Sequence, residues 1–316
     1  MTSVRATTPG TEDATGVNRP NERSAWRRIR RHRLALISGG MLAVLALACL
    51  SAPIIEQLSG HDSTRVNLFA RQSAPSPAHW LGTDELGRDL ALRLLYGGQV
   101  SLAVGLAGAA MAAGLGTFIG LIAGYIGGRT DAFLMRFTDG MIALPLLPLL
   151  IVLAAVDLHK AGVPSALADS ESVSLYRIIA IVALFGWTTA ARLVRAATLK
   201  VRESEYVLAS ITAGAGPFTV MYVHILPNVV SPLIVATTLS VGNVILLESV
   251  LSFLGLGIQP PLPSWGNMLS NAQDLIHSAP RLALFPGALI FFTVLTINLL
   301  GDAIADALNP RNAART

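Results

Sequence analysis

Charged residues and cysteine are both scarce in this chain. Only 13% of the 316 residues are charged, 53% are hydrophobic, and the mean hydropathy is +0.59. Soluble domains carry about 25% charged residues, so the composition excludes a soluble enzyme and indicates a protein that crosses a membrane several times. Cys49 is the single cysteine, which excludes an internal disulfide and a thiolate metal cluster.

Lysine is almost missing as well, and this removes one class of ATP-binding motif. A P-loop places a lysine between a glycine and a serine or threonine, and neither Lys160 nor Lys200 follows a glycine. The six histidines lack the spacing of a zinc site, and no Gly-x-Ser-x-Gly turn occurs. We therefore expect no catalytic, cofactor-binding or metal-binding residue here, with ATP and Mg bound by other subunits if ATP is used.

Hydrophobic runs long enough to cross a bilayer, which takes about 20 apolar residues, recur along the chain. They cover approximately residues 34–55, 100–127, 138–156, 175–198, 229–251 and 282–305. The sequence therefore predicts an all-α fold with six transmembrane helices.

The distribution of basic residues predicts which loops face the cytoplasm, because basic loops stay inside. With the N-terminus inside, sixteen of the 23 basic residues are cytoplasmic, and the other seven are Arg65, Arg71, Arg88, Arg93, Lys160, Arg177 and Arg281. We therefore expect both termini in the cytoplasm, with a disordered tail over residues 1–30 and a short tail over residues 309–316. The arginines before the first span adjoin the membrane, so nucleic acid is not an expected partner.

One cytoplasmic insert, residues 201–228, has the pattern of two short helices with a break between them. Good helix formers end at Gly214, and Pro217 then opens a second helix at its favoured first position. This second helix should end at Pro227. Apolar residues at helical spacing should form one stripe on it, namely Phe218, Met221, Tyr222 and Ile225. A helix of about nine residues is unstable alone in water, so the stripe predicts a partner surface.

The insert resembles the cytoplasmic EAA loop of bacterial ABC importer permeases. Ala209, Gly214, Leu226 and Pro227 match that loop, whereas Leu208 occupies the slot of its leading glutamate and Glu205 lies one turn earlier. The resemblance implies that the loop sits in a cleft of the ATPase subunit and transmits its closing motion. The residues expected in this coupling loop are Glu205, Ala209, Gly214, Phe218, Met221, Tyr222, Ile225 and Pro227.

The segment before the second span predicts an interfacial helix on the outer surface. Thr83 is a suitable N-cap, Asp89 and Arg93 are spaced as an i,i+4 pair, and Gly97 and Gly98 should end the helix. The run Leu-Gly-Thr-Asp-Glu-Leu-Gly-Arg-Asp at 81–89 resembles the C-type permease subunit of the oligopeptide and dipeptide importer branch.

A proline-rich stretch at 251–269 also resembles that subunit and should form a rigid outer turn, with Trp265 at the membrane interface. Ionisable and polar residues within spans are the candidates for a substrate path or gate. With Trp265, these are Glu248, Asn298 and Asp302. Glu248 either contacts the path or reaches the interface, and the second alternative is favoured. In the second span, small residues at every fourth position from Gly108 to Gly128 predict tight packing or sliding helices, with packing favoured.

The resemblance as a whole implies a type I ABC importer permease for short peptides in the inner membrane of a bacterium. A first helix and an extracytoplasmic segment at 31–97 would precede a permease domain at 98–308. Its partners would be a homologous permease, two ATPase subunits and an extracytoplasmic peptide-binding protein. A permease for nickel or glutathione remains an alternative, and an ATP-independent channel or ion-coupled carrier is a more distant one.

Overall fold

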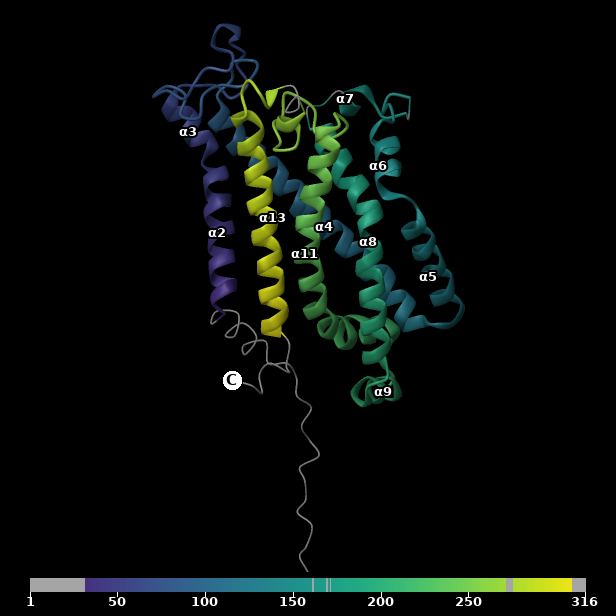
Figure 1. Ribbon diagram of the computed structural model, residues 1–316. Helices are drawn as coiled ribbons and strands as arrows, with labels where there is room; N and C mark the ends of the chain where they lie inside the picture. The colour runs from purple at the N-terminus through teal and green to yellow at the C-terminus, as the bar shows by residue number, and fades with distance from the viewer. Residues whose placement is uncertain (1–31, 161, 169, 171, 271–274, 309–316) are drawn as a thin grey trace, which may run out of the picture.

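The computed structural model describes residues 32–160, 162–168, 170, 172–270 and 275–308. Both expected tails, 1–30 and 309–316, lie outside the described residues. The long helices run side by side as a bundle (Figure 1). They are α2 (Arg33–Leu50), α4 (Leu90–Ile126), α8 (Val173–Arg202), α11 (Leu226–Phe253) and α13 (Arg281–Leu308). The shorter helices α5 (Gly128–Ala143) and α6 (Leu146–Ala154) follow one another as a bent pair that contacts α8. Short elements join them: α3 (Ala52–Ser59), η1 (Leu68–Ala70), α7 (Ser165–Ala168), α9 (Glu205–Thr212), α10 (Pro217–Thr219), η2 (Val220–Ile225) and η3 (Asn267–Leu269).

The described residues contain five helices long and apolar enough to cross a membrane, or up to six if a bent pair counts as one span. The all-helical, multi-span fold is therefore confirmed. In place of the third span expected at about 138–156, the structure has the pair α5 and α6, bent by 83°. Pro145 has no N–H and disfavours a helical residue before it, and Leu144 is accordingly extended.

The long helix α4 lies at the centre and packs against α8 and α11 through small residues. A Cβ added to Gly116 would lie 2.5 Å from the carbonyl oxygen of Trp187, and one on Gly120 would lie 2.5 Å from that of Ala191. These approaches of backbone to backbone confirm the packing interpretation of the small-residue stripe. Gly128 is the exception, since it lies beyond α4 with open space around it.

The expected interfacial helix before the second span is wrong. Residues 83–89 form a turn closed by a bridge between Thr83 and Asp89, and α4 begins only at Leu90. Asp89 caps α4 by accepting a hydrogen bond from the amide of Leu92 at 2.9 Å. Arg93 pairs with Asp84 at 3.2 Å rather than with Asp89.

The helix α4 then continues through Gly97 and Gly98 without ending. Both glycines lie against the ring of Trp265, and Gly98 also faces the thiol of Cys49 in α2. The two glycines therefore make room for a neighbouring side chain, and an i→i−4 helix tolerates them at a cost of about 1 kcal/mol each.

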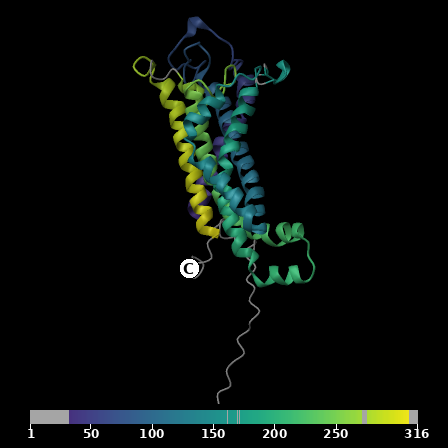
Figure 2. The ribbon, with the colours of Figure 1, turned by 90° about the vertical axis from the view of Figure 1, so that its right-hand side faces the viewer.

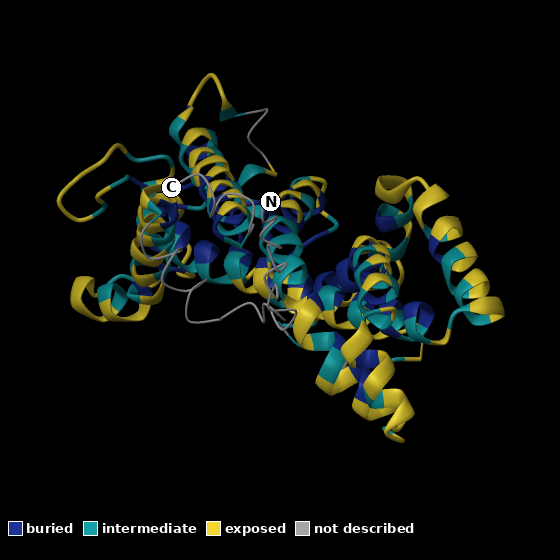
Figure 3. Ribbon diagram, turned by 90° about the horizontal axis from the view of Figure 1, so that it is seen from below, coloured by how far each residue is buried: buried dark blue, intermediate teal, exposed yellow. Residues whose placement is uncertain are grey.

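The two ends of the bundle differ in what they carry. The start of α2, the end of α13 and the hairpin around α9 lie at one end, which we call the hairpin end, whereas α3 and α7 lie at the far end (Figure 1). Seen from the hairpin end, buried residues gather between the helices and exposed residues face outward (Figure 3). This is the pattern of helices whose outer surfaces contact lipid.

Candidate functional site

The insert between α8 and α11 folds into a helical hairpin, residues 205–225, that projects sideways from the bundle (Figure 2). The turn at its tip depends on Gly214, whose φ of +89° lies in the left-handed region that glycine adopts without strain. Pro217 stands in the first turn of α10, as expected from its fixed φ. The helix, break and second helix of the sequence analysis are therefore all present.

The end of the second helix was predicted wrongly. The chain is helical without interruption from Pro217 to Phe253, and it passes through the π-helical segment η2 into α11. Pro227 is the second residue of α11, which directly follows the π-helical segment, so Pro227 does not end the helix. The second arm of the hairpin is thus continuous with a membrane-spanning helix.

One side of the hairpin is buried against the bundle. Val207 from α9 joins Val220 and Ile225 from η2 in a small apolar cluster. The cluster is completed by residues of α4, α8 and α11, namely Leu121, Val194 and Val229. The hairpin is therefore packed onto three membrane helices at once.

Polar contacts hold the two arms of the hairpin together. The Ser210 hydroxyl and the His224 Nε2 lie 3.0 Å apart and hydrogen-bond across the arms. The Asn228 side-chain amide donates to the Tyr206 hydroxyl at 3.1 Å. Arg202, just before the hairpin, donates to the carbonyl oxygen of Tyr125 at the end of α4 at 2.7 Å. The arms should accordingly move as one rigid unit.

The single apolar stripe expected on the second arm does not form. Ile225 is fully buried and Met221 is 9% exposed, whereas Phe218 is 73% exposed and Tyr222 is 51% exposed. A π-helix bonds residue i to i+5, so the 3.6-residue spacing assumed from the sequence does not hold across η2. Two of the four residues anchor the hairpin, and the other two face solvent.

The exposed surface of the hairpin includes apolar residues that the stripe did not name. They are Leu208 and Ile211 on α9, together with Val223 on η2. Leu208 and Ile211 are spaced i,i+3, a signal that was present in the sequence. Glu205 and Ala209 are exposed on the same helix. We call the set Leu208, Ile211, Phe218, Tyr222 and Val223 the hairpin surface.

At the far end, Glu248 and Trp265 are both fully buried. The favoured interpretation of Glu248 as a residue reaching the interface is therefore wrong, and so is the interfacial position of Trp265. The Trp265 indole N–H donates to the carbonyl oxygen of Leu94 at 2.9 Å. Gly97 and Gly98 of α4 have no side chains and leave room for the Trp265 ring inside the bundle, so the ring does not lie at the membrane interface.

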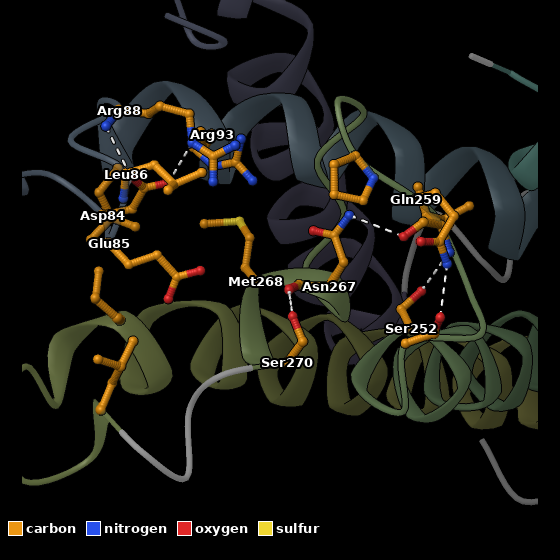
Figure 4. A pocket seen from close by; sticks show the side chains of 16 residues that line it. Asp84, Glu85, Leu86, Arg88, Arg93, Ser252, Gln259, Asn267, Met268 and Ser270 are labelled. Carbon is orange, nitrogen blue, oxygen red and sulfur yellow. Dashed lines mark hydrogen bonds and ion pairs between the residues drawn. The ribbon is translucent and has the colours of Figure 1, made fainter. Parts of the chain in front are cut away.

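A cavity of about 230 Å³, which neither Glu248 nor Trp265 lines, also lies at the far end (Figure 4). One wall comes from the turn before α4 and the start of that helix, including Asp84, Arg88 and Arg93. The opposite wall comes from the end of α11 and the loop after it, including Ser252 and Asn267. Asp84 Oδ2 forms ion pairs with Arg88 Nε at 2.7 Å and with Arg93 Nε at 3.2 Å. The first wall is therefore a compact ionic cluster.

The last two path candidates lie elsewhere, on α13. Asn298 is half-buried, and its Oδ1 lies 3.2 Å from the position that a Cβ on Gly242 of α11 would take. Asp302 is exposed one turn closer to the hairpin end. Among the described residues, no hydrogen bond or ion pair joins either side chain to Glu248 or Trp265. The four candidates therefore do not form one site within this chain.

Comparison with known families matches two parts of the chain. Residues 116–313 match the binding-protein-dependent transport system inner membrane component family. Residues 23–75 match the N-terminal transmembrane domain of oligopeptide transport permease C.

Characterised relatives align with nearly the whole chain. The glutathione transport system permease protein of Pectobacterium atrosepticum is 37% identical over 92% of this chain and 91% of its own. The dipeptide transport system permease protein of Bacillus subtilis is 38% identical over 95% of this chain and 89% of its own. The oligopeptide transport system permease protein of Bacillus subtilis is 36% identical, with 92% and 89% covered.

These matches, the apolar helices and the hairpin between α8 and α11 agree with one another. The chain belongs to the family of inner membrane components of binding-protein-dependent transport systems, and it is a multi-pass ABC importer permease that resembles the C-type subunit of the peptide branch.

Proposed function

We propose that this chain is the permease subunit of an ATP-driven importer for short peptides and that its hairpin docks on a separate ATPase subunit. The observation that carries the docking is the hairpin surface, where Phe218 and Tyr222 remain exposed on an element that is otherwise packed and hydrogen-bonded. Large aromatic side chains exposed on a rigid element are the residues that anchor protein interfaces.

The connections of the hairpin explain how docking would drive transport. Its first arm follows directly from α8, and its second arm continues into α11 without a break. Arg202 also ties the end of α8 to α4. Closure of two ATPase subunits on ATP would therefore displace α8, α11 and α4 together and switch the path from inward-facing to outward-facing. The buried Met221 and Ile225 transmit this displacement rather than contact the partner.

The residues of the EAA resemblance divide into three roles in this proposal. Phe218 and Tyr222 contact the ATPase, together with Glu205 and Ala209 on the exposed side of α9. Gly214 shapes the tip of the hairpin. Pro227 starts the membrane helix that carries the motion away.

Orientation rests on the sequence, in which sixteen basic residues belong to the segments expected inside and seven to the segments expected outside. The hairpin end is then cytoplasmic, and the far end faces the binding protein. Residues 31–97 form a first helix and extracytoplasmic segment, and residues 98–308 form the permease domain. A homologous permease would complete the translocation path.

A peptide is the cargo that the relatives favour, since their printed names include dipeptide and oligopeptide systems. Glutathione is the second candidate because one relative transports it, and glutathione is itself a short peptide. Competition between a labelled dipeptide and glutathione during uptake would distinguish these two cargoes.

The test is reconstitution of the chain with a second permease, ATPase subunits and binding protein in proteoliposomes. We expect the ATPase subunits to co-purify with the chain, and uptake of a labelled dipeptide to require ATP. Uptake that is equally fast without ATPase subunits would contradict the proposal and favour a channel or carrier.

Orientation has its own test, because Ser76 and Thr212 are both exposed and lie at opposite ends. A cysteine at Ser76 should react with a membrane-impermeant thiol reagent added outside, whereas a cysteine at Thr212 should not. Native Cys49 is buried and should stay unlabelled. Labelling of Thr212→Cys but not of Ser76→Cys would show that the hairpin end faces the outside, which contradicts the proposed topology.

A further inference from the structure

Glu248 is a fully buried carboxyl group near the far end of α11, in a part of the chain that spans the membrane. Its Oε1 accepts a hydrogen bond from the Ser252 hydroxyl at 2.7 Å, and its Oε2 accepts one from the Ser101 hydroxyl at 3.2 Å. None of the ion pairs found in the described part of the chain includes Glu248. Burying an ionisable group within a membrane span costs free energy, so the hydrogen bonds of Glu248 indicate a specific role.

The two serines pass these hydrogen bonds on to the loop that follows α11. We call residues 255–266 the proline turn. Ser252 Oγ accepts from the amide of Ile258 at 3.0 Å, and Ser101 Oγ accepts from the amide of Trp265 at 3.2 Å. Each hydroxyl therefore donates to Glu248 and accepts from one end of the proline turn.

The proline turn has no regular ladder of backbone hydrogen bonds, so side chains hold its shape and fasten it to the helices. Pro260, Pro261 and Pro263 have no N–H, so they cannot donate to a regular ladder of backbone hydrogen bonds. Asn267, which directly follows the turn, donates to the carbonyl oxygens of Leu262 at 2.8 Å and Ile258 at 3.3 Å. Asn267 gives the turn its shape, whereas the two serines fasten that shape to α4 and α11.

We propose that Glu248 is a positioning residue that holds the proline turn, and with it one wall of the far-end cavity, by orienting the hydroxyl groups of Ser101 and Ser252. A serine hydroxyl rotates freely and can instead donate to the carbonyl oxygen one turn earlier in its own helix. An acceptor between the two serines fixes both hydrogens. The lone pairs of the hydroxyls then point at the amides of Ile258 and Trp265.

The far-end cavity gives this arrangement a consequence for transport. Ser252, Ile258 and Asn267 line the cavity opposite the ionic cluster of Asp84, Arg88 and Arg93 (Figure 4). If the proline turn loosened, this wall would shift while the ionic cluster stayed in place. This part of the inference rests on the proposed function, because there the far end faces the incoming cargo.

Amide hydrogen exchange on the assembled transporter tests the positioning directly. In Glu248→Leu, which keeps the bulk and removes the acceptor, the amides of Ile258 and Trp265 should exchange about tenfold faster, equivalent to about 1.4 kcal/mol. Glu248→Gln accepts from one serine and can donate to the hydroxyl oxygen of the other, so exchange should rise much less than in Glu248→Leu. Ser240→Ala is the matched control, since its hydroxyl donates only within α11, to the Ala236 carbonyl oxygen.

Single serine variants sharpen the test and remain informative if Glu248→Leu fails to fold. Ser252→Ala should accelerate exchange at Ile258 much more than at Trp265, and Ser101→Ala should do the reverse. Unchanged exchange at both amides in Glu248→Leu would overturn the proposal. Equal acceleration of both amides by each serine variant would also overturn it, because the loss would then be general loosening.

Uptake and ATPase binding separate this inference from the proposed function. Glu248→Leu should lower dipeptide uptake, Glu248→Gln should restore it, and ATPase subunits should co-purify normally with both. If the transporter moves no peptide but the exchange pattern holds, the proposed function fails and the positioning role stands. If uptake is normal in Glu248→Leu despite faster exchange, the link between the proline turn and transport is wrong.

Discussion

Phe218 at the hairpin end is 73% exposed, whereas Trp265 at the far end is completely buried, although both are aromatic residues in segments between membrane helices. Trp265 fills a space between glycines of α4 and gives its N–H to the carbonyl oxygen of Leu94. Phe218 lies in the same arm of the hairpin as Tyr222 and Val223, which are also exposed. The contacts of Trp265 are therefore all made within the chain, whereas Phe218 belongs to an apolar surface that another chain could cover.

The polar residues show the same difference between the ends. At the far end, Glu248 and its serines are buried and connect backbone segments to one another. At the hairpin end, Ser210 and His224 hold together two arms whose outer surface remains exposed. Substitution in the buried contacts of Trp265 and Glu248 should lower stability, whereas substitution on the exposed hairpin surface should weaken partner binding.

Trp265→Ala should give the largest effect and should act on stability. Removing a fully buried tryptophan costs about 3–5 kcal/mol, and here it also removes the hydrogen bond from the indole N–H to the carbonyl oxygen of Leu94. The thermal unfolding temperature of the purified chain should fall clearly. Trp80→Ala, at an exposed tryptophan on the same end, is the control and should leave it unchanged. Equal unfolding temperatures for both variants would mean that Trp265 is not a structural residue.

Phe218→Ala should have the next largest effect and should act on binding instead. An aromatic anchor at an interface contributes about 2 kcal/mol or more, so affinity for the ATPase subunits should fall about 30-fold at unchanged unfolding temperature. Phe291, which is exposed on α13 within the membrane, provides the control variant Phe291→Ala. Normal affinity of Phe218→Ala for the ATPase subunits would show that the hairpin surface is not part of the interface.

Ser210→Ala should have the smallest effect, because it removes one partly buried hydrogen bond worth about 1 kcal/mol. The arms of the hairpin should separate more easily, which would show as faster amide exchange between residues 205 and 225. Thr212→Ala, whose hydroxyl donates only to the Ala209 carbonyl oxygen, is the control. If the two variants exchange alike, the Ser210 to His224 contact does not hold the arms together.

Much of the fold could be predicted from the sequence because its signals are local. Long apolar runs, the positive φ required at Gly214 and the proline at the start of α10 each depend on a few neighbouring residues. The small residues on α4 likewise indicated close packing, since backbone can approach backbone only where side chains are absent.

The other expectations failed where the assumed α-helical spacing did not hold locally, or where a contact came from a distant part of the chain. Asp89 was paired with Arg93 by helical spacing, but it caps α4, and Arg93 bonds to Asp84. Trp265 was placed at the interface by its residue type, but the space beside Gly97 and Gly98 accommodates it inside. Met221 and Ile225 were counted on a docking stripe because a π-helix cannot be recognised from apolar spacing.

Peptide transported per ATP hydrolysed by Gly214→Val tests the central claim, that the hairpin couples the ATPase to the path, most directly. A β-branched residue at a φ of +89° is strained, at a cost of about 1–3 kcal/mol. Gly216→Val is the matched control, because Gly216 also has open space around it but an ordinary φ of −70°. The account predicts that Gly214→Val reaches the membrane normally and that its transport per ATP falls about tenfold, while Gly216→Val stays at the wild-type value. Wild-type transport per ATP in Gly214→Val, at equal expression, would contradict the account.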